Sequence, residues 1–435
     1  MAKETHLSGF KDLLAEQMIP RQSITETIRK VYEDYGFVPL DTPAIERLET
    51  LQGKYGDEGE KLMYKLTDHG GRMLALRYDL TVPLARVVAQ HREKLPLPYK
   101  RYQIGKVWRG ESPQAGRYRE FTQFDADTVG TESIIADAEI AAMTADAMTA
   151  LGVEAIVKIN NRRILDALAE TIGIEDEARI RSLVGAIDKL GKVGKEKTLT
   201  KLTELFDSKS ALIVEAYLDA QGTTSEKLQH LEKILSKSSA AEEGINNIAE
   251  VFSILEGSGY SEQIIFDQTI ARGLDYYTGI IYETTLSDFP QLGSISGGGR
   301  YDNLISALGG PDLPAVGASI GVDRLIDGLS KSGKIEAPKT LTQALIVNFN
   351  ESHAPEYMHV ATQLRNAGIP AEIFHSSDRI SKQLKFANKM GIPFVVFLGP
   401  DELSQNTVQI KNLDTGNQKT MPLSKLAESI SDIIK

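Results

Sequence analysis

The sequence predicts an α+β protein in which helices flank an antiparallel sheet, with a helical insertion and a separate α/β domain at the C-terminal end. Three stretches lead to this prediction. Residues 99–129 read as two strands folded back on each other, residues 174–256 carry charged helical segments without a strand pattern, and residues 341–435 alternate short apolar strands with helices. A length of 435 residues, of which 41% are hydrophobic, is enough for roughly two or three globular domains.

The composition excludes several kinds of protein. There is no cysteine, so disulfides, thiolate nucleophiles and cysteine zinc sites are ruled out, and the histidines form no HExxH pair. No run of about 18 apolar residues occurs and the first residues, MAKETHLSGFKD, lack the pattern of a signal peptide, so we expect a cytoplasmic protein without a membrane span. A formal net charge of -11 argues against a nonspecific nucleic-acid coat but leaves room for a local basic surface.

The N-terminal part begins with a predicted amphipathic helix over residues 17–36. Its apolar side chains recur at helical spacing, at Ile24, Ile28, Val31, Tyr32 and Tyr35. Gly36 stands where the end of a helix favours a left-handed residue. In the stretch GFVPLDTPAI that follows, Pro39 and Pro43 exclude a continued helix and restrict any strand to an edge or an interface.

The next stretch predicts two short strands and a helix. A turn at residues 68–71 separates the strands, and the first turn of the helix holds Asp79 and Thr81. Both residue types commonly cap helices, but a point where a strand gives way to a helix is also a common location for ligand-binding groups. Capping and binding therefore stay open for Asp79 and Thr81 on these grounds.

The two strands within residues 99–129 meet at a loop, residues 110–116, whose Gly, Ser and Pro are turn formers. Side chains two apart along a strand share a face, so one face of the second strand carries Phe121, Gln123, Asp125, Asp127 and Val129. An unpaired buried carboxylate is costly, so this polar face, with Arg109 and Arg117 at the turn, indicates a pocket that binds a ligand. The alternative to a ligand pocket is that this is the solvent-exposed face of a hairpin at the protein surface.

Helices dominate the middle of the chain. Residues 132–151 predict a covering helix that ends at Gly152, VEAIVKINN reads as a strand, and RRILDALAETIG reads as a further helix. Within residues 174–256 a group of lysines fits either a solvated face or a loose contact with a polyanion: Lys192, Lys195, Lys197 and Lys201.

Strands return at residues 264–286 and lead towards PAVGASIGVDRL. Between them, glycines 297–299 are expected to allow close backbone approach and positive dihedral angles before a helix near Tyr301. This run matches neither GxGxxG nor GxxxxGK[ST], so dinucleotide-binding and P-loop folds lose their support. Arg272 and Arg324 lie near the ends of regular elements, where a surface salt bridge is the plain alternative to a ligand contact.

Five motifs resemble those of a known family. GFVPLDTPAI, VWRGESPQAGRYREF and GASIGVDRL resemble motifs 1, 2 and 3 of class II aminoacyl-tRNA synthetases, and ARGLDYYTG and SGGGRYD look like the two signature peptides of the histidyl-tRNA synthetase family. The resemblance covers essentially the whole chain. It implies a class II catalytic domain split between residues 1–173 and 257–333, the helical insertion at 174–256, and an anticodon-binding domain at 341–435. Motif 1, with Pro43, also implies a homodimer.

The activity implied by the resemblance is ATP-dependent ligation of L-histidine to tRNA-His through a histidyl-adenylate, with release of pyrophosphate and AMP and with Mg2+ as cofactor. The motifs do not imply which residues hold the metal. By resemblance, Arg109 grips the α-phosphate, Arg324 grips the γ-phosphate, and Arg272 approaches the α-phosphate at the reacting centre. A planar guanidinium suits this task because it pairs with two oxygens and stays charged.

The remaining site residues implied by the resemblance divide between the two small substrates. For ATP, Glu111 would accept from the adenine amine, Phe121 would stack on the base, and Arg117 would also contact the nucleotide. For histidine, Arg109 and Arg272 border the amino acid, and the other residues are Asp79, Thr81 and Gln123 at the α-ammonium, Asp127 and Tyr277 at the imidazole nitrogens, and Tyr276 along the pocket. A buried acceptor such as Asp127 also penalises a wrong amino acid.

Asp125 shares the polar face but has no role in the family pattern, so we predict a structural salt bridge for it. Two alternatives to the main reading exist. A synthetase-like regulatory subunit of ATP phosphoribosyltransferase shares the fold, but that branch generally lacks the anticodon-binding domain and loses catalytic residues. A class II ligase for another amino acid would share the ATP motifs, and RGLDYY and GGGRYD argue against it.

Overall fold

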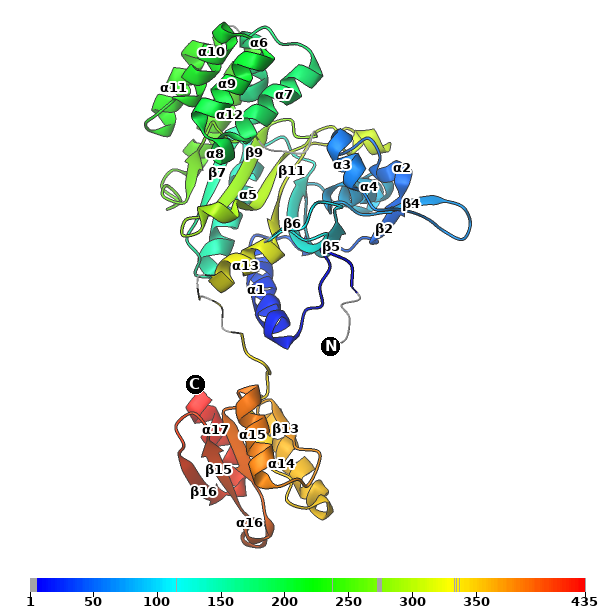
Figure 1. Ribbon diagram of the computed structural model, residues 1–435, viewed down its shortest axis with the longest axis vertical. Helices are drawn as coiled ribbons and strands as arrows, with labels where there is room; N and C mark the ends of the chain where they lie inside the picture. Colours follow the sequence, from blue (N-terminus) through cyan, green and yellow to red (C-terminus); the bar gives the residue numbers. More distant parts are fainter. Residues whose placement is uncertain are drawn as a thin grey trace. The chain divides into compact units, whose positions relative to one another are not determined.

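The computed structural model describes residues 6–114, 116–236, 238–271, 276–331, 333, 335 and 337–434. The chain divides into two compact units, the first within residues 1–11 and 24–335 and the second within residues 12–23 and 336–435. Each unit has a sheet of its own, and their elements are labelled in Figure 1. No helix in the described part of the chain combines the length and the hydrophobicity that a membrane span needs.

An eight-stranded sheet forms the centre of the first unit, in the order β1-β5-β6-β11-β10-β9-β7-β8. Neighbouring strands from β5 to β7 are antiparallel, and the edge strands β1 and β8 pair in parallel. The strands are β1 (Val38–Pro39), β5 (Tyr99–Trp108), β6 (Glu120–Val129), β7 (Ala155–Asn161), β8 (Ile264–Phe266), β9 (Ile280–Leu286), β10 (Ser294–Arg300) and β11 (Ala315–Gly321). The predicted α+β class with an antiparallel sheet is therefore confirmed.

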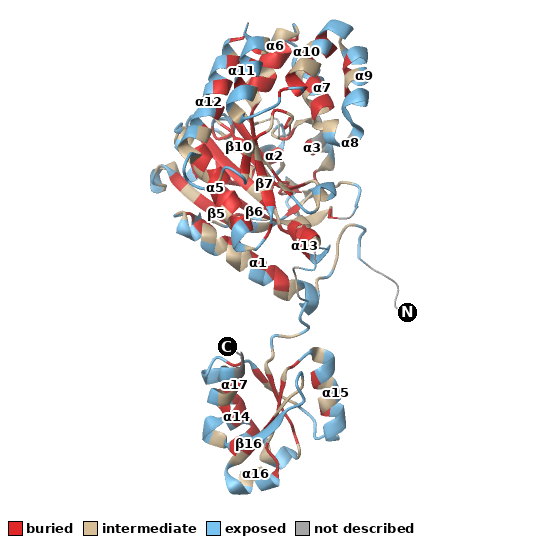
Figure 2. Cartoon of the chain, turned by 90° about the vertical axis from the view of Figure 1, so that its left-hand side faces the viewer, coloured by how far each residue is buried: buried red, intermediate tan, exposed pale blue. Residues whose placement is uncertain are grey.

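Helices and a small second sheet surround these strands. Figure 2 shows the strands as mostly buried, while the outer surfaces of the surrounding helices are exposed. The helices are α1 (Ala15–Asp34), α2 (Leu48–Leu51), α3 (Gly56–Leu62), α4 (Thr81–His91), α5 (Ile134–Ala150), α6 (Arg162–Thr171) and α13 (Val322–Lys331), with 3-10 turns at Arg92–Lys94, Pro290–Leu292 and Ser306–Leu308. The small sheet has the order β2-β4-β3, from β2 (Ile45–Arg47), β3 (Lys65–Thr67) and β4 (Met73–Leu76).

Two local predictions near these strands have different outcomes. Pro39 lies in β1 at the edge of the sheet, as its missing N–H requires. The glycine run at residues 297–299, in contrast, lies inside β10, and none of the three is among the described glycines with positive φ. The predicted helix near Tyr301 is wrong, because the described chain there contains only the 3-10 turn Ser306–Leu308.

A group of helices lies between α6 and β8 in the sequence and gathers at one end of the first unit (Figure 1). It consists of α7 (Glu177–Asp188), α8 (Leu190–Val193), α9 (Lys195–Leu205), α10 (Ser208–Leu218), α11 (Thr224–Leu235) and α12 (Ser239–Leu255). Buried side chains of these helices, such as Leu183, Val214 and Leu231, belong to the same hydrophobic cluster as the sheet residues Phe124 and Ile159. The helices therefore share one continuous core with the sheet.

The second unit is a five-stranded mixed sheet in the order β13-β12-β14-β15-β16, covered by helices. The strands are β12 (Ala344–Ile346), β13 (Ala371–Ile373), β14 (Phe394–Phe397), β15 (Thr407–Asn412) and β16 (Gln418–Pro422), and the helices are α14 (Ala354–Asn366), α15 (Ile380–Met390), α16 (Pro400–Gln405) and α17 (Leu426–Ile434), with 3-10 turns at Glu351–His353 and Leu423–Lys425. This order of strands and helices agrees with the α/β pattern predicted for the C-terminal end.

Candidate active site

The register of three neighbouring strands brings the predicted site residues onto one face of the sheet. In β6, Asp125 is opposite Gln103 of β5 and Ser319 of β11, and Asp127 is opposite Arg101 and Gly317. Directly opposed residues of antiparallel strands point to the same side. The face of β6 that the sequence predicts to be polar therefore continues across β5 and β11.

Glycines keep this face open where bulky groups stand on it. A Cβ on Gly317 would lie 2.1 Å from Oδ1 of Asp127, and one on Gly299 would lie 2.8 Å from Cδ1 of Tyr277. Real Cβ atoms do not approach other atoms so closely, so any side chain at these positions would displace the carboxylate or the ring. Gly299 and Gly317 therefore leave room for Tyr277 and Asp127. Two glycines of β10, Gly297 and Gly298, line the adjoining cavity itself, and we call these two the glycine floor.

A cavity of about 310 Å³ opens above this floor. Its walls come from β6, β10, β11, the start of α13, the loop between β5 and β6, and the tyrosines at 276 and 277. The predicted site residues that line it are Thr81, Arg109, Glu111, Arg117, Phe121, Gln123, Tyr276, Tyr277 and Arg324. Asp125, for which we predicted a structural salt bridge, lines it as well. Asp79 and Asp127 do not line the cavity among the described residues, although Asp79 contacts the lining residue Tyr276. Arg272 falls outside the described residues.

Three arginines, Arg109, Arg117 and Arg324, line the cavity. The guanidinium of Arg109 lies over the rings of Tyr78 (4.4 Å) and Phe121 (5.2 Å), and its Nε donates to the carbonyl of Tyr78 at 3.1 Å. Arg117 pairs with Glu111 at 3.4 Å, and Nη1 of Arg324 donates to the carbonyl of Ser294. Stacking and these contacts fix where the positive charges sit, which suits the binding of a polyanion such as a triphosphate.

The carboxylate of Asp79 accepts hydrogen bonds from three donors, one of them the cavity-lining Tyr276. The hydroxyls of Tyr55 (2.9 Å) and Tyr276 (3.2 Å) and the amide of Val82 (3.1 Å) donate to its carboxylate. The contact with Val82, in the first turn of α4, is a helix-capping bond. Burial raises the pKa of Asp79 above its usual value. Thr81 hydrogen-bonds Tyr276, so both residues at this strand-to-helix junction hold a side chain that lines the cavity.

Asp127 has a cationic partner that the sequence did not single out. Nη2 of Arg101, whose side chain is 0% exposed, lies 2.7 Å from Oδ2 of Asp127, and the hydroxyl of Tyr301 donates to Oδ1 at 2.6 Å. Burial raises the pKa of Asp127, and Arg101 opposes that rise. The hairpin register alone puts Arg101 opposite Asp127, so the pairing becomes predictable once the length of the turn is known.

The chain is similar to known proteins in sequence and in structure. The histidyl-tRNA synthetase family model matches residues 9–325, and the anticodon binding domain model matches residues 343–433. The histidine--tRNA ligase of Rhodopirellula baltica is 40% identical over 428 residues, which cover 98% of this chain and 96% of that protein.

The chain belongs to the histidyl-tRNA synthetase family.

Solved structures agree with this membership. The crystal structure of histidyl-tRNA synthetase from Nostoc sp. PCC 7120 is 34% identical, has a TM-score of 0.88, and covers 100% of both chains. A protein from Bacillus halodurans described as an ATP phosphoribosyltransferase regulatory subunit/histidyl-tRNA synthetase is 22% identical with a TM-score of 0.74, covering 90% of this chain and 97% of its own. The second likeness shows the fold alone.

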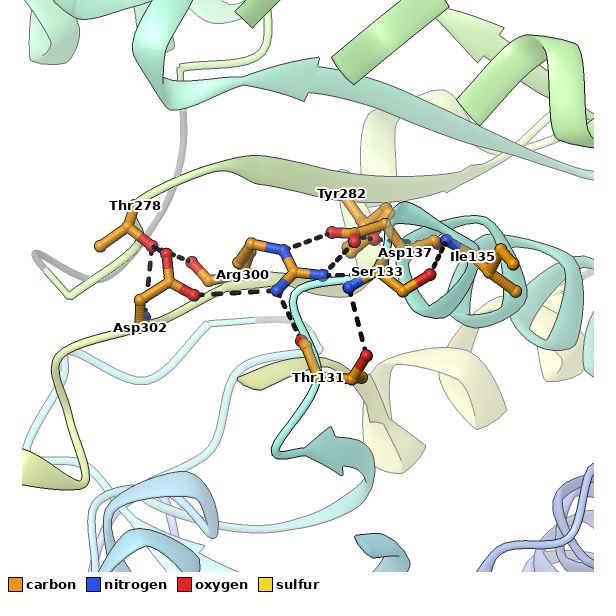
Figure 3. A network of polar contacts seen from close by, with 8 residues as sticks. All are labelled: Thr131, Ser133, Ile135, Asp137, Thr278, Tyr282, Arg300 and Asp302. Atoms are coloured by element: carbon orange, nitrogen blue, oxygen red, sulfur yellow. Dashed lines mark hydrogen bonds and ion pairs between the residues drawn. The ribbon is translucent and has the colours of Figure 1, made fainter. Parts of the chain in front are cut away.

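A buried ion pair joins α5 to the end of β10 (Figure 3). Nε of Arg300 donates to Oδ1 of Asp137 at 3.1 Å, and its Nη2 also pairs with that carboxylate. The carbonyl of Arg300 accepts from the amide of Thr278 at 2.8 Å, and the hydroxyl of Tyr282 donates to the carbonyl of Asp137 at 2.9 Å. Arg300 thereby anchors the chain beside Tyr301 on one side and next to Tyr277 on the other.

Asp125 differs from its prediction. The expected salt bridge is not found among the described residues, and Asp125 lies in the cavity wall with an exposure of 2%. Its side chain hydrogen-bonds Ser319, whose hydroxyl also accepts from Nε2 of Gln123 at 2.6 Å. Burial raises the pKa of Asp125 to about 7, an effect that Arg101 reduces and Asp127 increases.

Proposed function

We propose that this protein ligates L-histidine to tRNA-His, using ATP and passing through a histidyl-adenylate. The observation that carries the proposal is the division of the cavity, with Arg109, Arg117 and Arg324 on its walls and the acids of β6 along the same strand face. Histidine and ATP need these opposite charges within one cavity, because a carboxylate has to meet a phosphate while an ammonium and an imidazole are held nearby.

In the proposed first step, a carboxylate oxygen of histidine forms a bond to the α-phosphorus of ATP while the bond from that phosphorus to the bridging oxygen breaks. Pyrophosphate leaves with the negative charge. Arg109 and Arg272 are proposed at the α-phosphate and Arg324 at the γ-phosphate, where fixed cations stabilise charge as it develops. The contacts of Arg109 with Tyr78 and Phe121 support this role because they hold the guanidinium in place before ATP arrives.

The base and the amino acid would occupy separate ends of the cavity. Phe121 is proposed to stack on adenine, Glu111 to accept from its amine, and Arg117 to contact the nucleotide while its pairing with Glu111 keeps both side chains ordered. For histidine we propose Gln123, Thr81 and Asp79 near the α-ammonium, Asp127 and Tyr277 at the imidazole, and Tyr276 as part of the wall. Arg101 and Tyr301 support this assignment, since they hold Asp127 as an acceptor.

In the second proposed step, a terminal ribose hydroxyl of tRNA attacks the carbonyl carbon of the adenylate, gives up its proton, and displaces AMP. Mg2+ is proposed to enter with ATP, since phosphate oxygens supply much of its usual octahedral shell. Among the described residues there is no group of three or more His, Asp or Glu side chains placed to hold a metal. We also propose a homodimer, on the resemblance of the segment around Pro43 to motif 1.

Exchange of labelled pyrophosphate into ATP tests the proposal directly. Exchange should require histidine and Mg2+ and should not occur with the other standard amino acids. A protein that exchanges nothing with histidine would instead fit the regulatory-subunit alternative. The presence of Arg109 and Arg324 and of an anticodon binding domain disfavours that alternative. Deleting residues 341–435 should impair tRNA charging far more than adenylate formation, and light scattering on the intact chain tests the dimer.

A further inference from the structure

Two buried acceptors without a partner lie side by side in the cavity wall. Among the described residues, Oε1 of Gln123 and Oδ1 of Asp125 are both buried and accept no hydrogen bond. The two residues are two positions apart on β6, so their side chains stand on the same face, and both line the cavity. Buried acceptors are nearly always satisfied, so an unsatisfied pair that faces a cavity indicates a donor supplied by the ligand.

The other buried carboxylates of this region have cationic or several hydrogen-bonding partners. Asp79 accepts from three groups, and Asp127 accepts from Tyr301 through Oδ1 and forms an ion pair with Arg101 through Oδ2, although that oxygen accepts no hydrogen bond from the residues that the structure describes. Asp125 has a hydrogen bond with Ser319 and no ion pair among the described residues. A buried carboxylate without a paired cation is costly, so Asp125 is the acid of this face that gains most from a cation in the cavity.

We propose that Asp125 is a histidine-binding residue that accepts a hydrogen bond from the α-ammonium group of the substrate, next to Oε1 of Gln123. A primary ammonium has three N–H donors, so it can satisfy both orphan acceptors together, whereas a neutral imidazole has a single N–H. The inference rests on the proposed function, because it takes histidine to be the ligand. It adds a fixed carboxylate to the proposed α-ammonium group of Asp79, Thr81 and Gln123.

The protonation of Asp125 gives this contact a pH dependence. Burial raises its pKa to about 7 in the empty site, so a proton competes with the ammonium for the carboxylate near neutral pH. The titratable and polar groups close enough to interact with Asp125 electrostatically or by hydrogen bonding are Arg101, Asp127, Ser319, Asp79, Arg77, Tyr32 and Tyr277. Lowering the pH through 7 should therefore weaken the contact with the ammonium, which stays charged throughout this range.

The test compares histidine with 3-(imidazol-4-yl)propionate, which has the same ring and carboxylate but no amino group. Titration calorimetry measures both affinities for the intact protein and for Asp125→Asn. The variant should lose about 10- to 100-fold in affinity for histidine, the value of one hydrogen bond to a charged group, and almost nothing for the analogue. Asp127→Asn is the matched control and should weaken both ligands, because both carry the imidazole.

A second measurement varies the pH. The ammonium of histidine lowers the pKa of its imidazole relative to that of the analogue, so the titration of the ligands has to be removed by comparing two proteins. As the pH is lowered from about 8 to about 6, the preference for histidine over the analogue should fall in the intact protein relative to Asp125→Asn. Equal losses for both ligands in Asp125→Asn, an unchanged histidine affinity in that variant, or the same pH dependence of the preference in both proteins would each overturn the inference. If the unaltered protein binds no histidine at all, the proposed function fails instead.

Discussion

Arg101 offers a quantitative test of how the site is held together. Its guanidinium is fully buried, pairs with Asp127 at 2.7 Å, and is the chief group that opposes the rise in pKa of both Asp125 and Asp127. Arg101→Met leaves those carboxyls buried without their cation. Removing one partner of a buried ion pair typically costs about 3–5 kcal/mol in free energy of unfolding, and we expect a loss of that order.

The double variant Arg101→Met/Asp127→Asn separates pairing from packing. Replacing both charges leaves no unpaired ion at Asp127, so most of the lost stability should return, although histidine binding should not. Trp108 is the single tryptophan of the chain and lies on β5, so its fluorescence during urea unfolding reports on the unit that contains the pair. Arg181→Met removes an exposed ion pair with Glu177 and should have almost no effect.

Two results would refute this reasoning. One is a loss below about 1 kcal/mol for Arg101→Met, which would mean that the carboxylates do not depend on the guanidinium. The other is a double variant no more stable than the single one, since the cost would then come from the lost volume and not from the uncompensated charge.

Three further predictions concern the same face. Burial raises the pKa of Asp125 from 3.8 to about 7 on folding, so its contribution to the free energy of unfolding is complete below about pH 4 and is lost as the pH rises to about 7. Plots of stability against pH for ligand-free Asp125→Asn should lack this pH-dependent contribution. Identical plots for the variant and the unaltered protein would contradict the prediction. Gly317→Ala should lower the free energy of unfolding by about 1–3 kcal/mol and weaken histidine binding, because its Cβ would collide with Asp127. Gly321→Ala is the control: its Cβ would lie 3.5 Å from the nearest atom, so this variant should unfold in urea like the unaltered protein. Arg300→Met should lower the thermal midpoint of the first unit and slow adenylate formation, and a midpoint unchanged within error would show that its pairing with Asp137 carries no stability.

Much of the fold was predictable because the patterns that determine it are local. The order of strands and helices in residues 341–435 follows from short apolar runs between turn formers, and the shared face of Gln123 and Asp125 follows from the two-residue period of a strand. The glycines at 297–299 were misread for a physical reason. A run of glycines predicts turns when its neighbours are unknown, but here the chain of β11 approaches Gly298 and the ring of Tyr277 approaches Gly299 so closely that only glycine fits at these two strand positions.

The partners across the site were not predictable from local patterns. Arg101 meets Asp127 only through the register of the hairpin, and Tyr301 reaches the same carboxylate from a segment distant in the sequence. The pairing of Arg300 with Asp137 likewise depends on how α5 packs against the sheet. The missing salt bridge of Asp125 has the same origin, because the cation opposite this part of β6 is already bound to its neighbour.

The glycine floor also limits how the amino-acid pocket can be redesigned. A pocket is usually enlarged by trimming a side chain, but Gly297 and Gly298, which line the cavity, have none to trim, and their strand cannot recede without losing its pairing with β11. Room for a bulkier histidine analogue therefore has to come from the walls, where Tyr276 and Tyr277 stand. Libraries that seek new amino-acid substrates should vary those two tyrosines and leave the floor unchanged.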